Sequence, residues 1–91
     1  GTTMLWLKQA ASQFGLIAEA YKATLVDLKK ISVPVILHVV KNGSNLHFIV
    51  CFGKSEDQFL IADPAEGVKK MSDSELIEIW KSSALLTVST T

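Results

Sequence analysis

Cysteine, proline and glycine are scarce in this chain, and neither sign of charge is in excess. The 91 residues include one cysteine, two prolines and five glycines. The single cysteine, Cys51, excludes an internal disulfide, and the Cys and His residues do not have zinc-finger spacing, so we expect a reducing compartment. Nine basic residues balance nine acidic ones, and neither sign forms a block. This balance removes the electrostatic case for nucleic acid or an anionic membrane as a partner.

Long apolar runs are also absent. The longest has five residues, whereas a membrane-spanning helix needs about 20. The N-terminus lacks the basic start and apolar stretch of a signal peptide, so we expect a soluble chain. The length predicts a single domain over residues 1–91 with a thin core, because a chain of this size buries only about 60 to 65% of its unfolded surface.

Local patterns predict short helices and strands in alternation. Thr2 or Thr3 can cap a helix that runs to Phe14, and Gly15 suits a left-handed stop. Thr24 caps a second, shorter helix, and Ser72 with Glu75 forms a capping box for a third. Apolar and β-branched runs predict strands over residues 16–22, 35–40, 46–52, 58–62, 68–71 and 85–88. The order indicates an α+β domain in which a twisted antiparallel sheet of about four to five strands is flanked by helices.

An Asn-Gly pair between two strand-like runs is a strong hairpin signal, because both central residues of a type I′ turn need positive φ. With Asn42 and Gly43 at the centre, the predicted register sets Val39 against Leu46 and His38 against His47. Both histidines would then share one face of the sheet.

His47 and Asp63 are the candidate site residues. Asp63 ends a strand next to the His47 strand, so its carboxylate can reach the imidazole and fix its tautomer, as the third member of a nucleophile, base and orienter set requires. An Asp-Pro turn, in which the carboxylate binds nearby amides, is the alternative. A metal site of His38, His47 and Asp63 is a further alternative that the predicted register permits. Cys51 lies about 13 Å along the strand from His47 at ~3.3 Å per residue, so it cannot be the nucleophile that this histidine serves.

The order of several segments resembles the bacteriocin-processing cysteine peptidase domain of peptidase-containing ABC transporters, which cuts leader peptides after a double glycine. The helix that ends in Phe-Gly-Leu looks like the middle portion of that domain. The more specific matches are Val33-Pro34-Val35-Ile36 followed by His38, Asn45-Leu46-His47-Phe48-Ile49-Val50, Ile61-Ala62-Asp63-Pro64-Ala65-Glu66-Gly67, and Leu76 through Trp80 with Leu85-Leu86.

The resemblance implies a papain-like half-domain with His47 as general base and Asp63 as the group that orients it. Pro34, Gly67 and Trp80 match structural positions of the family. The implied partners are a leader peptide with a double-glycine motif and the membrane and ATPase domains of the transporter, at the cytoplasmic face of the membrane. No cofactor is implied.

The chain departs from the family pattern in one respect. The family's nucleophilic cysteine and the glutamine of its oxyanion hole lie in an N-terminal segment, and neither Gln9 nor Gln13 is followed by a suitable cysteine. We therefore expect no peptidase activity from this chain alone, whether it is a fragment, a gene that lost the segment or a half-enzyme completed by another chain.

Two further expectations follow from the missing segment. Its loss would uncover apolar residues such as Ile36, Phe48, Val50 and Leu60, which favours self-association. A non-catalytic module that binds a secretion substrate or partner protein is the alternative function.

Overall fold

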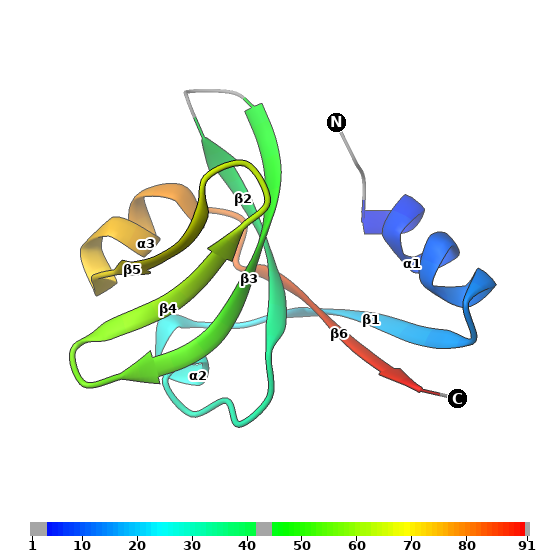
Figure 1. Cartoon of the computed structure of the whole chain (residues 1–91), viewed down its shortest axis with the longest axis horizontal. Helices are drawn as coiled ribbons and strands as arrows, with labels where there is room; N and C mark the ends of the chain where they lie inside the picture. The colour runs from blue at the N-terminus through cyan, green and yellow to red at the C-terminus, as the bar shows by residue number, and fades with distance from the viewer. Residues whose placement is uncertain (1–3, 42–44, 91) are drawn as a thin grey trace.

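The computed structural model describes residues 4–41 and 45–90, and its elements are built around one antiparallel sheet (Figure 1). None of the helices in this part of the chain is long and apolar enough to cross a membrane. The elements in chain order are α1 (Met4–Gln13), β1 (Leu16–Lys22), α2 (Leu25–Leu28), β2 (Val35–Lys41), β3 (Asn45–Ser55), β4 (Gln58–Asp63), β5 (Gly67–Met71), α3 (Asp73–Ile79) and β6 (Ala84–Thr90).

Helix starts and stops follow the local signals in the sequence. Ser72 caps α3 through a complete capping box with Glu75, as predicted, and Thr24 forms a second capping box with Asp27 at α2. Gly15, two residues beyond the end of α1, adopts φ +72°, the left-handed conformation that glycine reaches at no steric cost. The cap predicted at Thr2 or Thr3 lies outside the described residues.

Six strands form the sheet, in the order β1-β6-β2-β3-β4-β5, where four to five were predicted. The meander from β2 to β5 is as expected. The last strand, β6, inserts between β1 and β2: it pairs with β1 from Leu16↔Thr90 to Lys22↔Ala84, but with β2 only at Ile36↔Leu86 and Leu37↔Leu85. The N-terminal elements are therefore joined to the rest of the sheet through the C-terminal strand.

The predicted register of the β2–β3 hairpin is wrong by one residue. Lys41 pairs with Asn45, so three residues, 42–44, connect the strands rather than the two of a type I′ turn; the predicted Asn-Gly turn itself lies outside the described residues. His47 pairs with Val39 and His38 with Phe48. Because a shift of one residue moves a side chain to the other face, the two histidines lie on opposite faces of the sheet.

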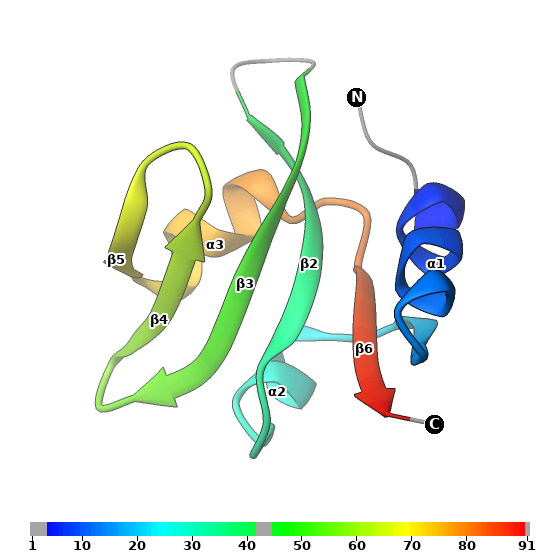
Figure 2. The same cartoon turned by 45° about the vertical axis from the view of Figure 1, so that its right-hand side comes forward.

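One face of the sheet carries the hydrophobic core. Alternate residues of β2, β3 and β4 point to this face, which α2 and α3 cover, while α1 lies at the β1–β6 end (Figures 1 and 2). Leu76 and Trp80 are buried there, and the Trp80 indole Nε1–H donates to the carbonyl oxygen of Ala84 at 2.9 Å. Trp6 and Phe14, by contrast, are 58% and 80% exposed.

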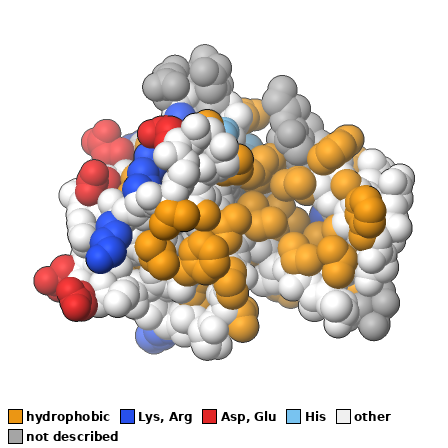
Figure 3. Space-filling model, viewed as in Figure 1, with side chains coloured by type: hydrophobic (Ala, Val, Ile, Leu, Met, Phe, Trp, Pro, Cys, Tyr) orange, Lys and Arg blue, Asp and Glu red, His pale blue; other side chains and the backbone are white. Residues whose placement is uncertain are grey.

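The opposite face of β2, β3 and β4 is apolar and only partly covered. Figure 3 shows hydrophobic side chains gathered over these strands on the side away from α2 and α3. We call this set the open apolar face; it comprises Ile36, Leu46, Phe48, Val50, Phe52 and Leu60, of which Leu46 is 51% and Phe52 47% exposed and the others are half-buried. Ile36, Phe48, Val50 and Leu60 were the residues expected to be uncovered.

Candidate functional site

His47 and Asp63 meet at the end of the sheet where β3 begins and β4 ends. The imidazole Nε2 lies 2.8 Å from the Asp63 carboxylate oxygen Oδ1. Both side chains point to the core face, because every second residue of a strand points the same way. His47 shares its face of β3 with the buried Ile49 and Cys51, and Asp63 shares its face of β4 with the buried Phe59 and Ile61. The sheet thus brings together the two residues that the sequence singled out.

Asp63 makes several hydrogen bonds although its side chain is fully buried. Oδ1 also accepts from the backbone N–H of Ala65 at 2.8 Å, and Oδ2 accepts from the Lys41 ammonium at 2.6 Å. The Asp-Pro turn and the contact with His47 therefore both exist and share one oxygen. Burial by itself raises the pKa of Asp63, but the bonds from Lys41, His47 and Ala65 outweigh it and hold the pKa well below its usual range. The carboxylate is ionised wherever the imidazole can act as a base.

Lys41 extends the site, and the sequence pattern alone did not identify it. Its side chain is 16% exposed, and its ammonium binds the carboxylates of Asp63 and Glu66; Lys69 binds the second Glu66 oxygen at 3.1 Å. The turn that places Glu66 is closed by its N–H, which donates to the Asp63 carbonyl at 3.2 Å. The sequence did contain a signal for this role. Lys41 follows Leu37 and Val39 at alternate positions of a buried strand, and a cation at such a position needs a partner.

His38 belongs to a different environment. Its ring stacks on Phe48 with centroids 4.9 Å apart and planes at 23°, on the face opposite His47. Within the described part of the chain its Nε2 is buried without a hydrogen-bond partner. The metal site of His38, His47 and Asp63 is thus wrong in its geometry, since the ligands cannot converge, and residues 4–41 and 45–90 hold no other group of three His, Cys, Asp or Glu side chains suited to a metal ion.

Cys51 is fully buried in the core cluster. Burial raises the pKa of its thiol, although a bond from the backbone N–H of Gly53 opposes this. A thiol that stays protonated and has no access to solvent is a poor nucleophile. This agrees with the expectation that Cys51 is not the nucleophile that His47 serves.

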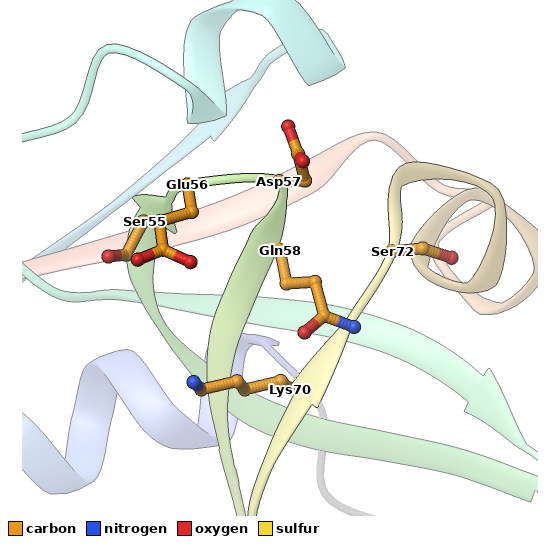
Figure 4. Close-up of a pocket in the computed structure, with 6 residues that line it drawn as sticks. All are labelled: Ser55, Glu56, Asp57, Gln58, Lys70 and Ser72. Carbon is orange, nitrogen blue, oxygen red and sulfur yellow. The ribbon is translucent and has the colours of Figure 1, made fainter.

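A polar hollow lies at the other end of β3 and β4, where the strands turn (Figure 4). Its lining consists of Ser55, Glu56, Asp57, Gln58, Lys70 and Ser72. These side chains come from the β3–β4 turn and from β5 and its end, so the hollow is separated from His47 by most of the length of β3. It supplies no histidine or cysteine and takes no part in the candidate site.

A buried carboxylate that holds an imidazole through Nε2 can fix its tautomer and stabilise its protonated form, which is the arrangement that a histidine general base requires. Comparison of the chain with known proteins identifies its family. The family model for the Peptidase C39 family matches residues 1–91, and the chain belongs to this family.

Relatives within the family are peptide transporters and peptidase domains. The chain is 40% identical over 84 residues to the transport/processing ATP-binding protein ComA of Streptococcus pneumoniae, a match that covers 88% of this chain and 12% of ComA. The peptidase domain of Streptococcus mutans ComA has the same fold, with a TM-score of 0.85 at 28% identity, over 98% of this chain and 75% of that one. A double glycine motif protease from an AMS/PCAT transporter, crystallised in complex with the leader peptide, gives a TM-score of 0.84 at 30% identity, over 100% of this chain and 62% of its own. The chain therefore spans about an eighth of its curated transporter relatives.

Proposed function

We propose that residues 1–91 are the C-terminal portion of a leader-peptide-processing cysteine peptidase domain that is linked to bacteriocin or peptide export by an ABC transporter. The observation that carries the proposal is the 2.8 Å contact between His47 Nε2 and a buried, ionised Asp63. A carboxylate in this position fixes the tautomer of a histidine and stabilises its protonated form.

His47 is the general base of the proposed reaction. Asp63 engages Nε2, so Nδ1 is the ring nitrogen that takes the proton from a cysteine thiol. The thiolate sulfur then forms a bond to the carbonyl carbon of the second glycine in the double-glycine motif; the C–N bond to the next residue breaks, and the imidazolium gives its proton to the leaving amine. Water then attacks the thioester while His47 accepts its proton; the C–S bond breaks, the leader is released with a free carboxyl group, and the imidazolium returns the proton to the thiolate.

The nucleophile in this proposal comes from outside the 91 residues. Cys51 is the only cysteine among them and lies in the core. Since His47 and Asp63 only activate a thiol and move its proton, the pair cannot form a thioester without one. The 91-residue chain by itself is expected to be inactive.

The names of the relatives support the proposed partners. ComA is a transport/processing ATP-binding protein, and the AMS/PCAT protease was crystallised with a leader peptide. By this likeness the chain acts on a double-glycine leader, is joined to the membrane and ATPase domains of a transporter, and works at the cytoplasmic face of the membrane.

The test is cleavage by the longer protein that contains this chain together with a reactive cysteine. That protein is incubated with synthetic double-glycine leader peptides, and products are identified by mass spectrometry. His47→Ala should lower the cleavage rate by about 10²- to 10⁴-fold, the usual contribution of a general base. His38→Ala, on the other face, and Cys51→Ala are the matched controls and should retain activity if folded. Cleavage that survives His47→Ala would contradict the proposal.

The open apolar face supports a second candidate function, a module that binds a secretion substrate or a partner protein without cutting it. Large exposed apolar patches are typical of contact surfaces. A second copy of the chain is one such partner, and we propose self-association through this face. Phe52→Ser and Leu46→Ser should then shift the chain toward monomer in light scattering, whereas a wild-type chain that is monomeric over a wide concentration range would exclude self-association.

A further inference from the structure

We propose that Lys41 is a positioning residue for the His47–Asp63 pair, fixing the plane and the charge of the carboxylate that holds the imidazole. Its meaning for catalysis rests on the proposed function, but its effect on Asp63 does not. Lys41 is the last residue of β2, and neither the sequence pattern nor the family resemblance gave it a role.

Geometry supports a positioning role first. The two oxygens of a carboxylate are fixed together, so a group that holds one of them sets where the other points. Lys41 holds Oδ2 at 2.6 Å, and the Ala65 N–H and His47 Nε2 each approach Oδ1 at 2.8 Å. The Lys41 side chain is itself largely buried, at 16% exposed, so its position is set by the strands around it. Without Lys41, the described contacts of the carboxylate are the two at Oδ1, and Oδ2 loses the bond that fixes the plane of the group from its other side.

Charge balance supports the same role. Among the described residues, Lys41 from β2 contacts the pair directly, Glu66 from the β4–β5 loop contacts Lys41, and Lys69 from β5 contacts Glu66. Two carboxylates and two ammonium groups cancel, so the network is neutral when the imidazole is neutral. Lys41 compensates the buried Asp63 charge independently of His47, which lets the imidazole lose and gain a proton without leaving the carboxylate unpaired.

The test uses the 91-residue chain labelled with ¹³C and ¹⁵N. The titration of the Asp63 carboxyl carbon and the ¹⁵N shifts of the His47 ring are followed by NMR in wild type, Lys41→Met and Lys41→Arg. Lys41→Met should raise the pKa of Asp63 by at least about one unit, because it removes a cation in contact with the carboxylate, and should change the ¹⁵N shifts of the ring. Lys41→Arg should restore both, since its guanidinium keeps the charge and the donors.

Lys29→Met is the matched control, because Lys29 also pairs with an aspartate, Asp73 at 3.0 Å, away from the site. It should leave the Asp63 titration unchanged. A folded Lys41→Met chain in which Asp63 titrates as in wild type would overturn the proposal. If Lys41→Met does not fold, the uncharged donor variant Lys41→Gln must show the same rise. The proposed function can fail independently: a longer protein that cleaves no leader while these shifts occur would refute the peptidase assignment and leave the role of Lys41 standing.

Discussion

Replacing Asp63 with asparagine is the sharpest test of how the site is held together. The asparagine side chain can keep an oxygen in place of Oδ1 for the Ala65 N–H, but its amide would present hydrogens to the Lys41 ammonium, which lies 2.6 Å from Oδ2 in the wild-type chain. The substitution removes a charge-assisted hydrogen bond, worth about 1.5 to 3 kcal/mol. Lys41 keeps Glu66 and is 16% exposed, so the cost stays below the ~3 to 5 kcal/mol of a fully stranded buried charge. We expect Asp63→Asn to lower the free energy of unfolding by about 2 to 3 kcal/mol at pH 7.

The pH dependence of the free energy of unfolding provides a second, independent test with the same substitution. Because the pKa of Asp63 is lower in the folded chain than in the unfolded one, its contribution to stability is fully present above the unfolded pKa of about 4 and is lost as the pH falls further. The uncharged amide of the Asp63→Asn variant makes no such contribution. The gap in unfolding free energy between wild type and variant should therefore be constant near neutrality and shrink below about pH 4.

The assay is urea unfolding followed by the fluorescence of the buried Trp80, at pH values from about 7 to about 3. A change of this size corresponds to a loss of roughly 10 to 20 °C in Tm for a domain of this length. Asp57→Asn is the control, because Asp57 is exposed in the β3–β4 turn. An Asp63→Asn chain within about 0.5 kcal/mol of wild type at neutral pH, the range of ordinary surface changes, or a gap that does not narrow in acid, would refute the reasoning.

Three shorter predictions concern the scaffold. Cys51 should resist alkylation by iodoacetamide in the native chain and react rapidly in urea, because burial raises the pKa of its thiol and blocks access; native labelling at the rate of a free thiol would contradict this. Gly53→Ala should destabilise the chain by about 1 to 3 kcal/mol in urea titrations, since Gly53 has φ +99° at the β3 bulge, whereas the new methyl group would make only ordinary van der Waals contact with Ile31 at 3.5 Å; unchanged stability would show that the strand relaxes freely. Ser72→Ala should lower the free energy of unfolding by about 1 kcal/mol, because it removes the N-cap of α3. Ser72→Asp should retain most of the stability, since aspartate is also a good capping residue. Equal losses of stability in the two variants would argue against capping.

Much of the fold was predictable because its signals are local. The capping box at Ser72 and the left-handed Gly15 depend on residues close together in the sequence. The His47–Asp63 contact was predicted for a related reason, because a proline after Asp63 ends β4 beside the strand that carries His47, and both the turn and the pair then follow.

The register of the β2–β3 hairpin could not be predicted from the sequence as reliably as these local features. A strand with one polar face fixes its own register, since a one-residue slip would bury polar groups. In β2 and β3 both faces are largely apolar: Val35, Leu37 and Val39 alternate with Ile36, His38 and Val40. A slip of one residue therefore costs little in hydrophobic pattern, and the Asn-Gly pair alone gave the wrong pairing for His38. Lys41 was missed for the same reason, because the hairpin register decides whether Lys41 lies on the same face of the sheet as His47.

The position of β6 constrains when the structure can form. Its neighbours in the sheet are β1 and β2, and among the described residues β1 pairs with no strand other than β6. During synthesis α1 and β1 emerge before β6, the strand that holds β1 in the sheet, so they cannot join the sheet until residues 84–90 have been made. Removing residues from 84 onward should thus leave the β2–β5 meander paired while α1 and β1 lose their place in the sheet.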